Sequence, residues 1–254
     1  MIAVAGSTLY LQYPLPFYVS WIIISMLSSG TVIFGLGKIV DVIGKIGPVI
    51  VVMSILLGLS AIIKNPAGLS KADEVIPTLN LMKASTNWLF AAGSYVGFCM
   101  LWLAAFMASM GATSNSRKEA ALGAIFGAAA FSVAIIIVAL GLMANIEQVS
   151  GSMIPSLILA GNIHPYVAVL FSLTVVAGIY TTAVPLLWTV SSRISDEKTK
   201  KFKIITIVLA VIGTIIGLKV PFDRLVNIIY VINGYIGILL LILMIIKSIK
   251  TKKI

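Results

Sequence analysis

The most informative shortage in this sequence is of charge. Of its 254 residues, 10% are charged and 60% are hydrophobic, whereas about a quarter of a soluble domain is charged and about half is apolar. This shortage excludes an ordinary soluble domain and indicates a polytopic membrane protein. The 18 basic residues outnumber the 8 acidic ones but lie in short gaps between apolar runs. They do not build the basic face of a protein that binds nucleic acid.

Groups for catalysis and metal binding are also scarce. The sequence has one cysteine, Cys99, and one histidine, His164, so a disulfide framework and a Cys/His metal cluster lack their parts. The motifs HExxH and GxSxG do not occur, which leaves metal-dependent and triad hydrolysis without candidates. We predict no catalytic residue, no metal cofactor and no enzyme activity. His164, just before Pro165, either caps a helix or couples a proton.

Seven apolar runs are long enough for transmembrane helices, since about 20 helical residues cross a hydrocarbon core of about 30 Å. Their continuity favours helices over the alternating pattern of a barrel. The predicted spans are residues 17–36, 42–64, 86–111, 118–144, 164–190, 202–219 and 225–247. Residues 1–12 form a partial N-terminal helix that Pro14 and Pro16 would end. The predicted fold class is therefore all-α and polytopic, with residues 1–254 in one transmembrane domain within the lipid bilayer.

The basic residues divide unequally between the two sides of this arrangement. Thirteen fall on the side of the C-terminus and of the connections 37–41, 112–117 and 191–201, and five fall on the other side. The positive-inside rule therefore predicts a multi-pass protein of the plasma membrane with a cytoplasmic C-terminus. The two longer outer connections, 65–85 and 145–163, then face outward.

Local patterns predict how some connections are built. Gly35 to Gly47 lacks the spacing of a phosphate-binding loop and predicts a flexible cytoplasmic turn. Ser116-Arg117-Lys118-Glu119 predicts a capping box. The apolar stretch Met153–Gly161 is too short to span and predicts a re-entrant or surface-lying segment over an outer vestibule.

A first candidate site lies in the third predicted span, where paired small residues interrupt the helix near its outer end. Such a segment either unwinds and exposes backbone groups to a solute or packs closely on another helix. The candidate solute-binding residues are Gly93, Ser94, Tyr95, Gly97 and Cys99.

A second candidate site lies in the fifth predicted span. Gly178, Thr181 and Thr182, followed by Pro185, can offer hydroxyl and carbonyl oxygens to a hard cation such as Na⁺. Alternatively, the threonines bond back to carbonyls of their own helix. A third polar group, Asn227, Tyr230 and Asn233 in the last span, is expected to form hydrogen bonds between helices.

The order of spans resembles that of the YkvI-like membrane proteins. The resemblance is carried by Asn87-Trp88 to Gly111, by Ile154-Pro155-Ser156-Leu157 and by Ile179-Tyr180-Thr181-Thr182-Ala183. That family is similar to the amino acid-polyamine-cation superfamily, with the LeuT-type fold of two inverted five-helix repeats. The resemblance implies helices three to ten of that fold. Residues 1–64 would be a remnant of the first repeat, and residues 86–254 would form the second five-helix repeat.

The resemblance also implies a function. Gly93 to Gly97 would line a solute cavity, Gly178, Thr181 and Thr182 would form half of a sodium-like site, and the protein would be a secondary transporter of a small, amino-acid-like solute. By the same resemblance, about 80 residues would be missing before Met1, and the exposed groove left behind would favour a homo-oligomer. Two alternatives stay open, a membrane sensor or receptor subunit that does not transport and an inactive fragment.

Overall fold

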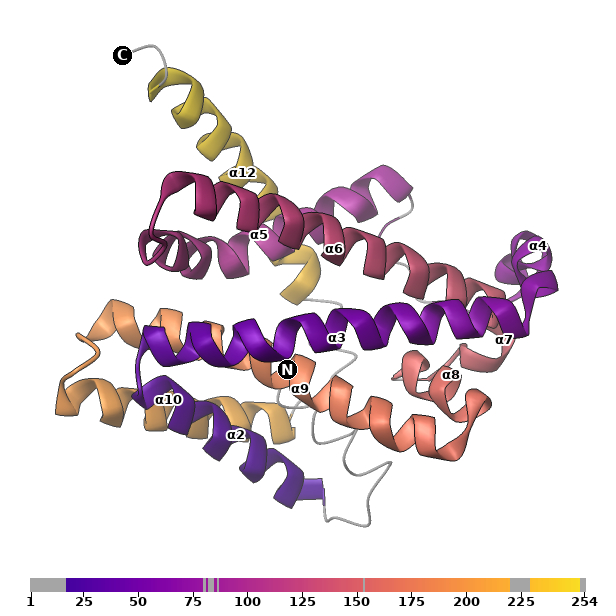
Figure 1. Ribbon diagram of the computed structural model, residues 1–254, viewed down its shortest axis with the longest axis horizontal. Helices are drawn as coiled ribbons and strands as arrows, with labels where there is room; N and C mark the ends of the chain where they lie inside the picture. The colour runs from indigo at the N-terminus through magenta and orange to yellow at the C-terminus, as the bar shows by residue number, and fades with distance from the viewer. Residues whose placement is uncertain are drawn as a thin grey trace.

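The computed structural model describes residues 17–79, 81, 85, 87–152, 154–219 and 229–251 (Figure 1). In this part of the chain the regular secondary structure is helical and no strand occurs, which confirms the all-α class. The elements are α2 (Phe17–Ile33), α3 (Leu36–Lys64), α4 (Pro66–Val75), the 3-10 helix η1 (Ile76–Thr78), α5 (Trp88–Ala112), α6 (Arg117–Ala144), α7 (Ile146–Val149), α8 (Pro155–Ile163), α9 (Pro165–Ile194), α10 (Lys200–Lys219) and α12 (Val231–Thr251).

Five helices are long and apolar enough to cross a membrane, namely α3, α5, α6, α9 and Val231–Lys250 of α12. Each lies at a predicted span, so the chain is a multi-pass membrane protein. At the other two predicted spans, α2 has 17 residues and α10 begins with a lysine-rich turn, which shortens its apolar stretch. The count of seven spans and the LeuT-type repeat are therefore not confirmed. The predicted partial helix at 1–12 and the turn after it lie outside the described residues.

The connection between α2 and α3 is shorter than predicted. Gly35 has φ +87°, a conformation that glycine adopts without a Cβ clash. From Leu36 onward, α3 runs without a break through Gly44, Gly47 and Pro48. The predicted connection at 37–41 was wrong, because these residues belong to α3 and the chain turns at Gly35 instead.

The long helices α3 and α6 lie side by side (Figure 1) and approach closely through small residues. A Cβ added to Gly58 would lie 2.7 Å from the carbonyl oxygen of Ile137, and one added to Gly141 would lie 3.0 Å from that of Gly58. This approach brings their C-terminal ends together, where α4, α7 and α8 gather (Figure 1).

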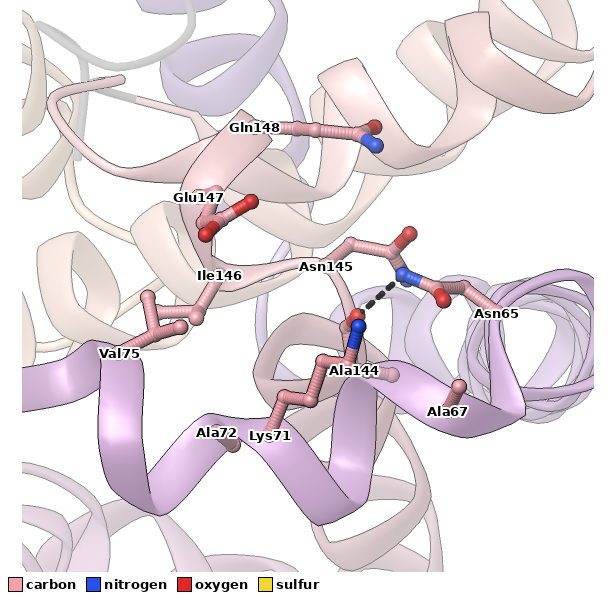
Figure 2. A pocket seen from close by; sticks show the side chains of 11 residues that line it. Asn65, Ala67, Lys71, Ala72, Val75, Ala144, Asn145, Ile146, Glu147 and Gln148 are labelled. Carbon is pink, nitrogen blue, oxygen red and sulfur yellow. Dashed lines mark hydrogen bonds between the residues drawn. The ribbon is translucent and has the colours of Figure 1, made fainter.

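Two asparagines join these ends, each capping the other's helix. Asn65, which follows α3, donates from Nδ2 to the carbonyl oxygen of Ala144 at 2.7 Å, as Figure 2 shows. Asn145, which follows α6, donates to the carbonyl oxygens of Ala61 at 3.3 Å and Gly141 at 2.9 Å. The last carbonyls of a helix lack partners within it, so this exchange satisfies them and links α3 to α6.

The apolar segment predicted to be too short to span forms α8. Leu157, Leu159 and Ala160 are buried in a cluster with residues of α3 and α9. Lys64 Nζ donates to the carbonyl oxygens of Asn162 at 3.2 Å and Ile163 at 3.0 Å, and a cation at a helix C-terminus is favourable. The C-terminal end of α3 is therefore tied to α8.

At the other end of the molecule, α2, α3, α5, α9 and α10 share a second apolar cluster. Its buried members are Val32, Ile39, Phe106, Val184, Trp188 and Phe202. Beside it, Glu197 Oε1 accepts hydrogen bonds from the backbone N–H of Leu36 at 3.1 Å and from the indole N–H of Trp188. The carboxylate holds the start of α3 against α9, and the predicted cytoplasmic connection 191–201 is reduced to the residues between Ile194 and Lys200.

Candidate functional site

The predicted solute segment on α5 does not unwind in this structure. α5 is continuous from Trp88 to Ala112, and Ser94 and Gly97 are buried. A Cβ added to Gly97 would lie 2.0 Å from the carbonyl oxygen of Gly234, and one added to Gly234 would lie 2.1 Å from Ser94 Oγ. The sequence left open whether this segment unwinds or packs closely on another helix. In the structure it packs closely, on α12.

The other side chains of the segment form a polar cluster with aromatic walls. Tyr95 and Cys99 lie one turn apart on α5, close enough for the hydroxyl and the thiol to interact, and Tyr230 lies near Cys99. Phe98 stacks on Tyr230 with ring centroids 4.0 Å apart, and Trp102 meets Tyr230 edge-on at 5.9 Å. Hydroxyl, thiol and aromatic groups within a span suit a small solute with polar and apolar parts.

Tyr230 enters this cluster from an irregular turn. Ile229 and Tyr230 are π-helical, just before α12 begins at Val231. Single π-helical turns are rare in proteins overall, but those that occur often lie at functional sites. The sequence predicted that Tyr230 forms hydrogen bonds between helices; its observed contacts with α5 are aromatic, so the hydrogen bond stays a prediction. Asn227 of the same group lies outside the described residues.

The threonine pair on α9 bonds to its own helix. Thr181 Oγ1 donates to the carbonyl oxygen of Gly178 at 3.0 Å, and Thr182 Oγ1 donates to the same oxygen at 2.9 Å. This is the second alternative that the sequence left open. Both hydroxyl oxygens keep lone pairs, and a Cβ added to Gly178 would meet nothing within 4 Å. Three oxygens, two hydroxyl and one carbonyl, therefore lie together on one stretch of α9.

A cavity separates α5 from α9 on the side that the charge pattern predicts to be cytoplasmic. Its volume is about 290 Å³. The residues that line it are Ala105, Ser109, Trp188, Thr189, Ser192 and Arg193. Sequence reasoning did not identify this cavity, because its hydroxyls come from helices about 80 residues apart and form no local motif.

Among the described residues, no hydrogen bond joins the two predicted sites. α5 and α9 meet instead at Phe106 and Trp188, whose rings are 6.0 Å apart and nearly perpendicular. Phe106 lies about two helical turns from Cys99. The cavity next to this contact therefore lies between α5, which carries the predicted solute residues, and α9, which carries the predicted cation residues.

Two predicted caps are observed. Ser116 Oγ accepts the backbone N–H of Glu119 at 3.1 Å, which confirms the serine half of the capping box. Glu119 Oε2 accepts the N–H of Asn115 at 3.0 Å, one residue earlier than a standard box. His164 Nδ1 accepts the N–H of Tyr166 at 3.3 Å, so the histidine caps α9.

No protein-family model matches the chain, and no curated protein or solved structure matches it either. The described residues define a class, which is an all-helical, multi-pass membrane protein. The resemblance to the YkvI-like proteins stays a prediction from the sequence.

Proposed function

We propose that the protein is a secondary transporter of a small, amino-acid-like polar solute, coupled to a cation gradient and not an enzyme. The observation that carries the proposal is the cavity between α5 and α9, because these helices bear the predicted solute and cation sites. In this proposal the cavity is part of the path to the two sites that alternating access requires. We also propose that the protein belongs to the YkvI-like family, has the LeuT-type fold and forms a homo-oligomer in the plasma membrane.

In this proposal the solute contacts α5 through Tyr95 and Cys99. Tyr95 has 47% of its surface exposed and Cys99 is half-buried, so both are accessible without a change in packing. Ser94 and Gly97 are covered by α12. They contact solute only in a state in which α12 has moved away from α5, which makes this helix pair the moving part of the cycle.

The cation site in this proposal consists of the carbonyl oxygen of Gly178 and the hydroxyl oxygens of Thr181 and Thr182. Oxygen ligands suit hard cations, and Na⁺ is the coupling ion that we propose. The threonine hydroxyls now point at the Gly178 carbonyl. Binding requires them to rotate so that their lone pairs face the ion.

Reconstitution of the full chain into liposomes tests the proposal. We expect accumulation of a radiolabelled amino acid from a mixed pool when a Na⁺ gradient points inward, and loss of accumulation when the gradient is collapsed. Tyr95→Phe and Cys99→Ala should lower the rate, while Tyr235→Phe, an exposed tyrosine on α12, should not. Solute binding without any flux would overturn transport and favour the sensor alternative, and neither binding nor flux would overturn both.

A further inference from the structure

A second cavity lies at the opposite end of the molecule, where α3 turns into α4 and α6 turns into α7 (Figure 2). Its volume is about 180 Å³, which is room for several water molecules and hence for the six heavy atoms of alanine. Its charged and amide-bearing lining residues are Asn65, Lys71, Asn145, Glu147 and Gln148. The charge pattern predicts that this end faces outward.

The cavity has charges of opposite sign on its two walls. Lys71 belongs to α4 and Glu147 to α7, and Figure 2 shows them on opposite sides. Within the described residues the ion pairs are Lys38–Asp41 and Lys45–Asp41, so Lys71 and Glu147 pair neither with each other nor with another described residue. The space between them separates a cation from an anion.

The backbone strengthens this polarity. The last turns of α3 and α6 end at the cavity with a partial negative charge. Because the amide nitrogens of Asn65 and Asn145 donate to helix carbonyls, their Oδ1 atoms keep their lone pairs for a ligand. Asn145 is 9% exposed, while Lys71 and Glu147, which line the same cavity, are exposed.

We infer that this cavity binds a small zwitterion, a free α-amino acid. The carboxylate lies against Lys71, and the ammonium lies against Glu147 and the asparagine oxygens. A lone anion would face Glu147, and a lone cation would face Lys71, so each would meet a like charge that disfavours it. The inference is independent of the proposed transport, because the site shares no residue with the predicted solute or cation sites.

Equilibrium binding of radiolabelled L-alanine to the purified full chain tests the inference. The assay is run in detergent and in potassium buffer without Na⁺, so that a sodium-dependent site does not contribute. Lys71→Gln and Glu147→Gln should each weaken binding roughly tenfold, as expected for the loss of a hydrogen bond to a charged group. Glu74→Gln, on α4 but outside the cavity, and Lys118→Gln, on α6 far from it, are the matched controls and should bind as the unchanged protein does.

Competition distinguishes the chemistry. Acetate and methylammonium, which carry one charge each, should displace alanine poorly. Displacement by acetate alone would show a simple anion site and overturn the inference. Displacement of alanine by phosphoethanolamine at a much lower concentration than by unlabelled alanine would assign the cavity to a lipid headgroup and also overturn the inference.

The outcome separates this inference from the transport proposal. Alanine binding that persists unchanged in both charge variants would place the ligand elsewhere and refute the outer site, whatever the liposome assay shows. Binding that depends on Lys71 and Glu147 would support the outer site even in a protein without measurable flux.

Discussion

Glu197 accepts the indole N–H of Trp188, and the same carboxylate oxygen accepts the backbone N–H of Leu36. One side chain in the short connection before α10 thus joins α9 to the start of α3. Gly35 is part of this arrangement, because a Cβ there would lie 2.9 Å from Glu197 Oε2. The contact closes the end of the molecule that holds the cluster around Val32 and Phe202.

The first prediction concerns this contact. Glu197→Ala should destabilise the purified protein by about 1–2 kcal/mol, because two donors lose their acceptor. Glu197→Gln, which keeps a carbonyl oxygen, should cost less. Thermal unfolding in detergent of Glu197→Ala, Trp188→Phe and the double variant measures their coupling, which we expect to be about 0.5–2 kcal/mol. Strict additivity of the two changes would show that the indole contact contributes nothing.

A second prediction concerns the approach of α5 and α12. Gly234→Ala puts a methyl group where Ser94 Oγ lies 2.1 Å away and the Ser94 carbonyl oxygen 2.6 Å away. The helices must separate, and overpacking of this kind costs about 1–3 kcal/mol. Gly123→Ala on α6 is the control, since nothing lies within 4 Å of its Cβ and alanine favours the helix. Equal melting temperatures for both variants would contradict the observed packing.

A third prediction concerns orientation, which the structure does not show. Cys99→Ala gives a protein without cysteine, into which Glu74→Cys on α4 or Lys198→Cys before α10 can be introduced. If the positive-inside rule holds here, a membrane-impermeant maleimide added to intact cells labels the cysteine at 74 and not the one at 198. Permeabilised cells, in which both positions should react, are the control. The reverse labelling pattern would show the opposite orientation, in which the cavity between Lys71 and Glu147 faces the cytoplasm.

These contacts indicate which features the sequence could predict. The positions of the long helices follow from apolar runs, and the caps at Ser116 and His164 follow from neighbours within three residues, so local pattern was enough. The start of α3 was missed because its N-terminal partner, Glu197, is 161 residues away in the chain. No window along the sequence contains both groups.

For the candidate sites, too, local patterns could be predicted and contacts between distant residues could not. The sequence left two alternatives for the small-residue segment on α5, unwinding and packing, and the choice depended on Gly234, which is 137 residues further on and fits against Gly97. The exchange of caps between Asn65 and Asn145 likewise gave no sequence signal. Each asparagine alone is an ordinary helix terminator, and the cavity beside them exists because α3 and α6 end together.

The last prediction concerns the threonine pair and rests on the proposed transport. Thr182→Val removes an oxygen from the proposed cation site and should raise the Na⁺ concentration for half-maximal uptake roughly tenfold, the effect of losing about 1.4 kcal/mol of ion binding. Thr174→Val is the matched control, because Thr174 Oγ1 donates to the carbonyl oxygen of Leu170 on the same helix at 3.3 Å, as Thr182 does to Gly178 at 2.9 Å. Both variants lose one bond to their own helix, so any shared effect is structural. A change in Na⁺ dependence confined to Thr182→Val would identify a ligand, while equal changes in both would reduce the pair to ordinary helix residues.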